Sequence, residues 1–353
     1  MTRPFVIDGV CHPYNLAPDN LRGEFGKAFA DIVWSFHPLV NPPHNSLPRQ
    51  VWDRDWQPRE FIDTMLVESD TDMVCVHALP IFDAFVDGFC AADKCAELKR
   101  RWPDRVIWYA TADIFTGRQA LDELRHQVTE LGADGIKLFP AQYHHGRTRS
   151  WRMDDYTLAF PVFELARELG IRNVAVHKAL PTGPVASDSM RVDDIERAAA
   201  AFPDLNFQIV HAGLMFVEET KVMLLNHPNV YATLENSFTN LLLNPVGFTS
   251  MLADFLSYGG PHKVIYSSGA INPHPRYLLE VFERFEMPEG FPVPLTEEVR
   301  AALLGGNLAR LHGIDIDERR ARIAGDEFDR ERQERPREPW DTVRAAAAAE
   351  AAR

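Results

Sequence analysis

The sequence contains no long apolar run and no excess of positive charge. Nowhere do about 18 apolar residues follow one another, as a membrane-spanning helix requires. The N-terminus, MTRPFVIDGV, has too short an apolar stretch for a signal peptide. Among 353 residues, 37 Lys and Arg stand against 51 Asp and Glu, and the net charge of −14 opposes binding to a phosphate backbone. We therefore expect a cytoplasmic protein that binds neither membranes nor nucleic acids.

Cysteine is scarce as well. The chain has four cysteines, and none of them belongs to a CxxC pair. So few thiols in a chain of 353 residues do not provide a disulfide framework. We interpret Cys75 and Cys90 as small apolar residues of the core.

Short runs rich in β-branched residues recur along the chain, and helical patterns over 118–132, 160–169, 193–201 and 296–311 alternate with them. Parallel neighbours in a sheet need a crossover of a dozen or more residues, so this alternation indicates parallel pairing. Eight such units predict closure into a (β/α)8 barrel, whose active site lies at the carboxyl ends of the strands. The eight strand candidates are FVIDGV, DMVCVHAL, RVIWYATAD, DGIKLFP, RNVAVHKAL, NFQIVHAG, NVYATLE and KVIYSSG.

Two segments interrupt this regular spacing. Residues 13–60 are rich in Pro, Asn and aromatic residues, which is typical of a loop that covers the mouth of a barrel. Residues 316–353 are densely charged and end in an Ala run, so they cannot build a core of their own. We predict one barrel domain over 1–315, with 13–60 as a movable lid. A charged C-terminal tail over 316–353 follows it, as a peripheral helix or a frayed end.

Seven titratable side chains stand at the carboxyl ends of the strand candidates. A buried polar group there needs either a partner or a function, and seven groups directed at one mouth are difficult to explain as core filling. Imidazoles and a carboxylate with open coordination positions suit a catalytic Zn, Fe or Mn ion, which holds a water molecule for activation. The seven are His12, His77, Asp113, Lys137, His177, His211 and Glu235.

A series of short motifs occurs in a fixed order: IDGVCH, GIKLFP, FPVFELARELGIRNVAVH, IVHAG followed by FVEE, HPNVYATLE and LLGGNLARLHGI. In this order and spacing the chain resembles the amidohydrolase superfamily over about residues 5–315. Within it, the sequence is most similar to the amidohydrolase-related group that contains aminocarboxymuconate-semialdehyde decarboxylase and the resorcylate-type decarboxylases. The resemblance implies a (β/α)8 barrel enzyme with one or two divalent metal ions at the strand ends.

The resemblance also implies a metal site from which two usual ligands are missing. The first strand of the family carries two histidines, and here Val10 stands in the place of the first and His12 in the place of the second. The fifth-strand ligand of the family matches His177, and the sixth-strand histidine, a ligand or a general base, matches His211. The eighth strand normally ends in a metal-binding aspartate that also acts as the base, whereas Gly269 stands here.

Two further residues complete the candidate site. Glu235 shares a strand face with Tyr231 and Thr233 and is directed at the mouth, so it could replace the carboxylate missing at Gly269. We predict His12, His177, His211 and Glu235 as metal ligands, and Lys137 and His211 as catalytic residues. Lys137 matches a family lysine that is carbamylated in binuclear members. A plain ammonium there would stabilise an anionic substrate or an oxyanion.

Other side chains have weaker claims to a role in the site. His77 and Asp113 have no fixed role in the family and orient their neighbours instead. Arg147 and Arg149 could pair with a substrate carboxylate. A cluster of aromatic residues in the segment 13–60 either anchors the lid or lines the pocket, namely Trp34, Phe36, Trp52 and Trp56.

Three functions are consistent with these residues. The first is metal-dependent hydrolysis or non-oxidative decarboxylation of a small, partly apolar carboxylate or ester. The second is non-haem iron oxygenation on the same barrel, because histidines with a carboxylate suit iron as well as zinc. The third is a degenerate accessory or maturation protein, which the loss at Val10 and Gly269 would explain. We also expect a small-molecule substrate and a homo-oligomer.

Overall fold

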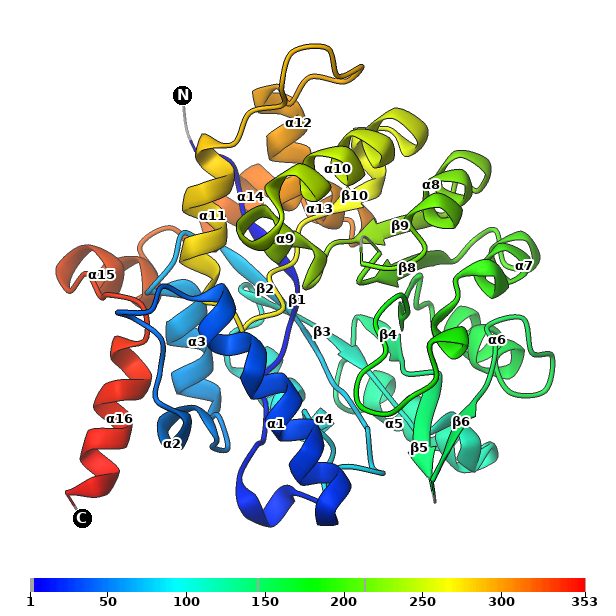
Figure 1. Cartoon of the computed structure of the whole chain (residues 1–353), viewed down its shortest axis with the longest axis horizontal. Coiled ribbons are helices and arrows are strands. Elements are labelled where there is room, and N and C mark those ends of the chain that lie inside the picture. Colours follow the sequence, from blue (N-terminus) through cyan, green and yellow to red (C-terminus); the bar gives the residue numbers. More distant parts are fainter. Residues whose placement is uncertain (1–2, 145, 213, 353) are drawn as a thin grey trace.

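Eight parallel strands form the centre of the molecule (Figure 1). The computed structural model describes residues 3–144, 146–212 and 214–352. The strands pair in the order β1-β2-β3-β4-β7-β8-β9-β10, so each of the predicted strands is present. Their bounds are β1 Ile7–Cys11, β2 Met73–His77, β3 Val106–Ala110, β4 Gly135–Leu138, β7 Asn173–His177, β8 Asn206–Val210, β9 Val230–Thr233 and β10 Val264–Ile265.

Backbone hydrogen bonds between the first and last strands of this order close the sheet into a barrel. The Gly9 amide donates to the Tyr266 carbonyl at 3.0 Å, and the Gly269 amide donates to the Val10 carbonyl at 3.1 Å. In a closed barrel the carboxyl ends of all strands surround one mouth. The predicted (β/α)8 architecture is therefore confirmed.

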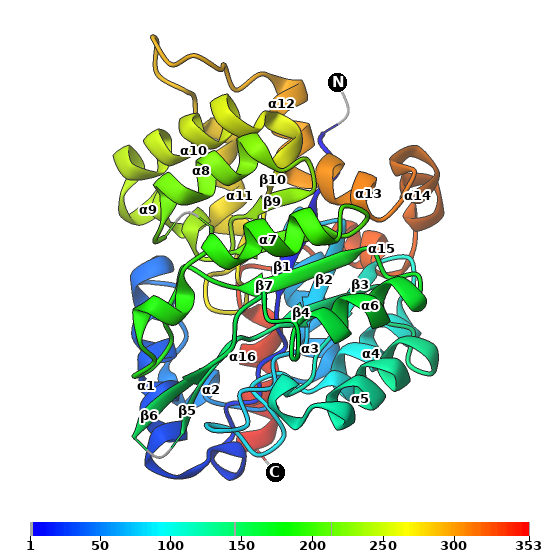
Figure 2. The ribbon, with the colours of Figure 1, turned by 90° about the vertical axis from the view of Figure 1, so that its right-hand side faces the viewer.

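Helices cover the outside of the barrel (Figure 1, Figure 2). The helices predicted over 118–132, 160–169 and 193–201 are α5, α6 and α7, and the one over 296–311 is divided into α12 and α13 by a π-helical turn. The helices that connect or follow the barrel strands, from β2 onward, are α4 Ala92–Arg101, α5 Arg118–Thr129, α6 Phe160–Glu168, α7 Asp193–Ala201, α8 Val217–Asn226, α9 Asn240–Leu243, α10 Pro245–Gly259, α11 Pro275–Arg284, α12 Glu297–Ala301 and α13 Asn307–Leu311.

The α7 helix shows why these segments are helical and why they face the barrel. Acidic residues fill its first turn, where they stabilise the positive end of the helix dipole. Ile195, Ala198 and Ala199 follow at helical spacing and are all buried. An apolar stripe of this kind packs on the strands and leaves the opposite face to solvent.

The segment predicted as a lid is largely helical. It contains α1 Gly23–Val40 and α2 Arg49–Trp52, and α3 Pro58–Leu66 starts at its end. Trp52 and Trp56 are fully buried, so they anchor the segment, whereas Phe36 is 44% exposed. A hairpin of β5 Ala141–His144 and β6 Arg147–Ser150, which the sequence analysis did not predict, lies next to α1 (Figure 2). Movement of the lid stays a prediction.

The charged C-terminal segment is folded against the barrel. It forms α14 Ile316–Ile323, α15 Glu327–Glu334 and α16 Asp341–Ala351, and α16 lies beside α2 and α3 (Figure 1). The buried carboxylate of Glu68 accepts hydrogen bonds from the backbone amides of Trp340 and Thr342, at 2.8 and 2.7 Å. Trp340 itself is fully buried, with its ring 4.7 Å from that of His274. These contacts attach the segment to the barrel.

No helix among residues 3–144, 146–212 and 214–352 has both the length and the apolar content needed to cross a membrane.

We predict that Trp340→Ala lowers the free energy of unfolding by about 3–5 kcal/mol, because a large buried side chain is replaced by a cavity. Urea denaturation followed by circular dichroism measures the change. Tyr156→Ala is the control, since Tyr156 is 78% exposed and its removal is expected to cost less than about 1 kcal/mol. Equal effects of the two substitutions would show that the C-terminal segment does not contribute to the core.

Candidate active site

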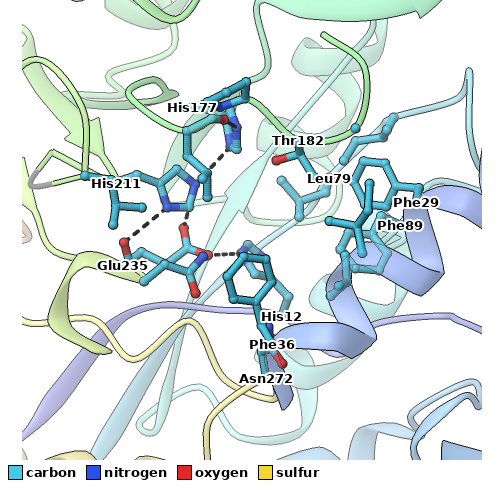
Figure 3. A pocket seen from close by; sticks show the side chains of 18 of the residues that line it. His12, Phe29, Phe36, Leu79, Phe89, His177, Thr182, His211, Glu235 and Asn272 are labelled. Carbon is cyan, nitrogen blue, oxygen red and sulfur yellow. Dashed lines mark hydrogen bonds and ion pairs between the residues drawn. The ribbon is translucent and has the colours of Figure 1, made fainter. Parts of the chain in front are cut away.

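A cavity of about 440 Å³ opens at the carboxyl ends of the strands. Its wall includes all five residues that were predicted as metal ligands or catalytic groups. Figure 3 labels four of them, His12, His177, His211 and Glu235. The barrel therefore brings together residues from five different strand ends, which is where active sites of this architecture occur. The five are His12, Lys137, His177, His211 and Glu235.

Glu235 lies at the centre of the polar side of this cavity and is only 3% exposed. Its Oε1 is 3.3 Å from His12 Nε2, and its Oε2 is 3.5 Å from His211 Nε2. Within the described residues, no hydrogen bond to Oε2 is formed. Burial raises the pKa of Glu235, but His211 and His12 outweigh this effect and hold the pKa well below its ordinary value. The carboxylate is therefore ionised at neutral pH.

The side chain of Glu235 fills the space beside Gly269. A Cβ atom at position 269 would lie 3.1 Å from Glu235 Cγ and 3.0 Å from Asn236 Oδ1. The backbone φ of Gly269 is +71°, a conformation that residues other than glycine rarely adopt. Glycine at this position and the long carboxylate on the neighbouring strand thus accommodate each other.

Each of the three imidazoles has one ring nitrogen bound to a backbone carbonyl. His12 Nδ1 is 2.8 Å from the His77 carbonyl, and His177 Nε2 is 2.7 Å from the Leu180 carbonyl. His211 Nδ1 is 3.1 Å from the Glu235 carbonyl. A carbonyl oxygen only accepts, so each of these nitrogens carries the proton. In His177 and His211 the other nitrogen then presents a lone pair toward the cavity, whereas His12 Nε2 faces the Glu235 carboxylate.

Two of these lone pairs face each other. His211 Nε2 lies 3.0 Å from His177 Nδ1. Burial lowers the pKa of His211 to about 4 and that of His177 well below its ordinary value, so both rings are neutral at pH 7. Two acceptors at this distance repel each other unless positive charge lies near them. The arrangement favours a cation or a shared proton at this point.

The donor types suit a divalent metal ion, although the side chains do not converge on one point. Three imidazole nitrogens and a carboxylate oxygen are a common ligand set for Zn, Fe or Mn. As the side chains stand, no three His, Cys, Asp or Glu residues in the described part of the chain form a group that could hold a metal ion. The donors follow one another from His177 through His211 and Glu235 to His12. An ion bound by three of them therefore requires a side-chain rotation.

The backbone at His211 adopts a strained conformation. Its φ is +66°, which lies in the left-handed region that residues other than glycine seldom occupy. Such strain persists only where the surrounding structure imposes it, and it is common at functional positions. Here the turn directs Nδ1 to the Glu235 carbonyl and Nε2 to His177.

Lys137 provides the unpaired positive charge of the site. It is fully buried on β4, and its Nζ has no hydrogen-bond partner among the described residues. Burial lowers the pKa of Lys137 to about 8, although Glu235 opposes this effect. The group is thus mainly an ammonium at pH 7. An unpaired buried charge is costly, so a ligand that pairs with it binds favourably.

The other predicted residues lie outside this group. The His77 ring stacks on that of Tyr109 at 4.4 Å, and its carbonyl orients His12. Asp113 caps a short helical turn by accepting from the Phe115 amide at 3.0 Å. The guanidinium of Arg149 lies over the Phe115 ring at 3.8 Å. None of these side chains, nor that of Arg147, lines the cavity.

Most of the apolar side of the cavity was not predicted from the sequence. Phe29, Val33 and Phe36 of α1 line it, together with Phe89 and Phe139. Phe36 was named as a candidate, but it was not distinguished from the buried tryptophans of the same segment. The only available signal was the helical spacing of Phe29, Val33 and Phe36, which also describes an ordinary core-facing stripe.

Comparison with known proteins identifies relatives of this chain. The sequence model of a protein family described as Amidohydrolase matches residues 43–314. No curated protein matches the sequence.

Solved structures show the same fold at low sequence identity. An uncharacterised TIM-barrel protein from Bordetella bronchiseptica has a TM-score of 0.65 and 17% identity, over 87% of this chain and 98% of that one. A 2,6-dihydroxybenzoate decarboxylase from Rhizobium has a TM-score of 0.55 and 16% identity, over 89% and 99% of the chains. A 5-carboxyvanillate decarboxylase from Novosphingobium aromaticivorans with bound manganese has a TM-score of 0.57 and 12% identity, over 88% of this chain and 97% of that one.

We predict that Lys137→Met raises the free energy of unfolding at pH 7 by up to about 3 kcal/mol. The folded-state pKa, about 8, lies below the ordinary value of 10.5. Between these two pH values the unfolded chain binds more protons, so the stability of the unsubstituted protein rises with pH. The advantage of the variant should accordingly disappear as the pH rises through this interval.

Denaturant unfolding at a series of pH values measures this difference. Lys27→Met is the matched control, because Lys27 is exposed and its removal should change stability by less than about 0.5 kcal/mol at any pH. A stability gain of Lys137→Met that is the same at pH 7 and above pH 10.5 would contradict the unpaired ammonium.

Proposed function

The chain belongs to the amidohydrolase family, and from this premise we propose that it is an enzyme that removes the carboxylate of a small, partly apolar acid by non-oxidative decarboxylation. The observation that carries the proposal is the unpaired ammonium of Lys137 in a cavity with apolar walls. Lys137 attracts a carboxylate, and the apolar surroundings then disfavour the negative charge of that carboxylate. Loss of CO2 moves this charge to the substrate carbon, and protonation of that carbon removes the charge from the cavity.

The proposed reaction has two steps. In the first, the bond between the carboxylate carbon and the substrate breaks, CO2 leaves, and the electron pair stays on the substrate carbon, from which an adjoining aromatic ring delocalises it. In the second, Lys137 Nζ donates a proton to that carbon and later regains one from solvent. An acid whose pKa lies near the working pH is well suited to this transfer. The pKa of Lys137, about 8, meets that condition.

The His211 ring and the Glu235 carboxylate accept hydrogen bonds on the polar side of the cavity. Both are unprotonated at neutral pH, because the pKa of each is lowered. They can therefore accept a hydrogen bond from a hydroxyl group of the substrate while charge develops on the substrate. Hydrolysis of an ester is the second candidate function, since Glu235 Oε2 has no hydrogen-bond partner among the described residues and can accept a hydrogen bond from an attacking water molecule.

A divalent metal ion is part of the proposal. His12, His177, His211 and Glu235 would hold it, and the facing lone pairs of His177 and His211 support this assignment. When bound, such an ion polarises a substrate oxygen or lowers the pKa of a water molecule.

We predict that the rate of CO2 release falls as the pH rises through about 8, because the Lys137 ammonium loses its proton there. Lys137→Met should lower kcat by at least about 100-fold. Lys137→Arg keeps the charge and attracts the carboxylate, but its guanidinium does not release a proton. It should therefore keep KM within about threefold while kcat falls.

Release of CO2 and of the decarboxylated product from a panel of aromatic and arylalkyl carboxylates measures the reaction. Lys27→Arg is the control for a general effect of arginine. If Lys137→Arg retains full kcat, Lys137 serves only as an anion-binding group and the proposed proton transfer is wrong.

We also predict that His177→Ala and Glu235→Gln each lower the bound metal by at least about tenfold while the barrel remains folded. Elemental analysis of the purified proteins measures the metal, and circular dichroism monitors the fold. Bound iron together with O2 consumption would favour oxygenation, and an unsubstituted protein without metal would favour an accessory role. The ligand assignment fails if both variants retain the metal content of the unsubstituted protein.

A further inference from the structure

The cavity has a charged side and an apolar side. In Figure 3, His177, His211 and Glu235 lie together on one side, whereas Leu79, Phe29 and Phe89 lie on the other. Among the residues that line the cavity, Lys137 is the only Lys or Arg. A ligand that matches this distribution carries one anionic group and an apolar body.

The apolar side is built mainly by α1. Phe29, Val33 and Phe36 of this helix line the cavity, and they recur at helical spacing on one face. The Phe29 and Phe89 rings pack edge to face at 5.4 Å, and the Phe89 ring stacks on that of Tyr14 at 4.0 Å. These contacts hold the wall residues in defined positions, so little ordering is required when a ligand binds.

The backbone of α1 is fixed at both ends. Near its start, a Cβ atom at Gly26 would lie 2.2 Å from the Ala84 carbonyl, so only glycine allows this close approach. Near its end, His37 Nδ1 donates to the Asn272 carbonyl at 2.8 Å, and the Leu47 amide donates to His37 Nε2 at 3.0 Å. The helix thus presents its apolar face to the cavity as a fixed surface.

The apolar wall continues to the surface of the molecule. Ile32 and Phe36 of α1 are 39% and 44% exposed, and Leu243 on α9 is 46% exposed. All three line the cavity. Exposed apolar side chains around a pocket indicate a binding surface rather than an ordinary protein surface. A ligand anchored at Lys137 and extending outward would contact them.

We propose that the substrate is a monocarboxylate with an extended apolar body, an arylalkyl acid, whose body lies along the α1 face formed by Phe29, Val33 and Phe36. This inference deepens the proposed function, since it places the carboxylate at Lys137. A second carboxylate on the body has no cationic partner on this side of the cavity and loses its hydration there. Dicarboxylates should therefore bind less tightly than monocarboxylates of equal length.

Calorimetric titration with butanoate, hexanoate, octanoate and octanedioate tests the proposal without turnover. Each added methylene should tighten binding about fourfold as it becomes buried against α1. Octanedioate should bind at least about tenfold more weakly than octanoate. Phe36→Ser should flatten the dependence on chain length and leave butanoate affinity within about twofold.

Leu39→Ser is the matched control. Leu39 also lies on α1 and is 61% exposed, but it does not line the cavity, so its substitution should leave the whole series unchanged. The inference is overturned if affinity does not rise with chain length, if octanedioate binds as tightly as octanoate, or if Leu39→Ser has the same effect as Phe36→Ser. If the chain-length series holds but no acid of the aromatic and arylalkyl panel releases CO2, the decarboxylation proposal fails while the apolar binding face stands.

Discussion

Three carbonyl groups fix the chemistry of the cavity before any ligand binds. They hold one nitrogen of His12, His177 and His211, so the remaining nitrogens of His177 and His211 face each other as acceptors, and His12 Nε2 faces the Glu235 carboxylate. An anion among acceptors is stable only near positive charge, and Lys137 provides the nearest permanent one. One side of the site is therefore rich in negative potential, which suits a cation, a proton or a polarised substrate.

The barrel was predictable because its sequence pattern is repetitive. Each strand is short, buried and followed by an amphipathic helix, and eight repeats leave few alternatives to a closed parallel barrel. The five strand-end residues of the site followed from the same rule. Asp113 also stands at a strand end in the sequence, but its carboxylate caps the following helical turn and does not line the cavity. A carboxylate at a strand end can accept hydrogen bonds from nearby backbone amides as readily as it can contact a ligand.

The parts that could not be predicted depend on contacts between distant segments. The α1 face looks like any amphipathic helix, and only its position over the strand ends makes it a cavity wall. The composition of 316–353 indicated a peripheral segment, yet Trp340 is one of its few large apolar residues and is fully buried. A single side chain of this kind does not alter a segment's composition, so its role appears only in three dimensions. The missing aspartate at position 269 is likewise explained only by the structure, in which the Glu235 side chain lies beside Gly269.

The contacts of Trp340, which precedes α16, determine when the apolar wall of the cavity is stabilised during synthesis of the chain. Glu68 and Trp340 are 272 positions apart, and the Trp340 ring lies 5.3 Å from that of His37, which ties α1 to the loop carrying Asn272. During synthesis, the strands and all the polar groups of the site leave the ribosome long before Trp340 does. The cavity thus acquires its polar residues early, whereas the contacts that steady its apolar wall form only after Trp340 has been synthesised.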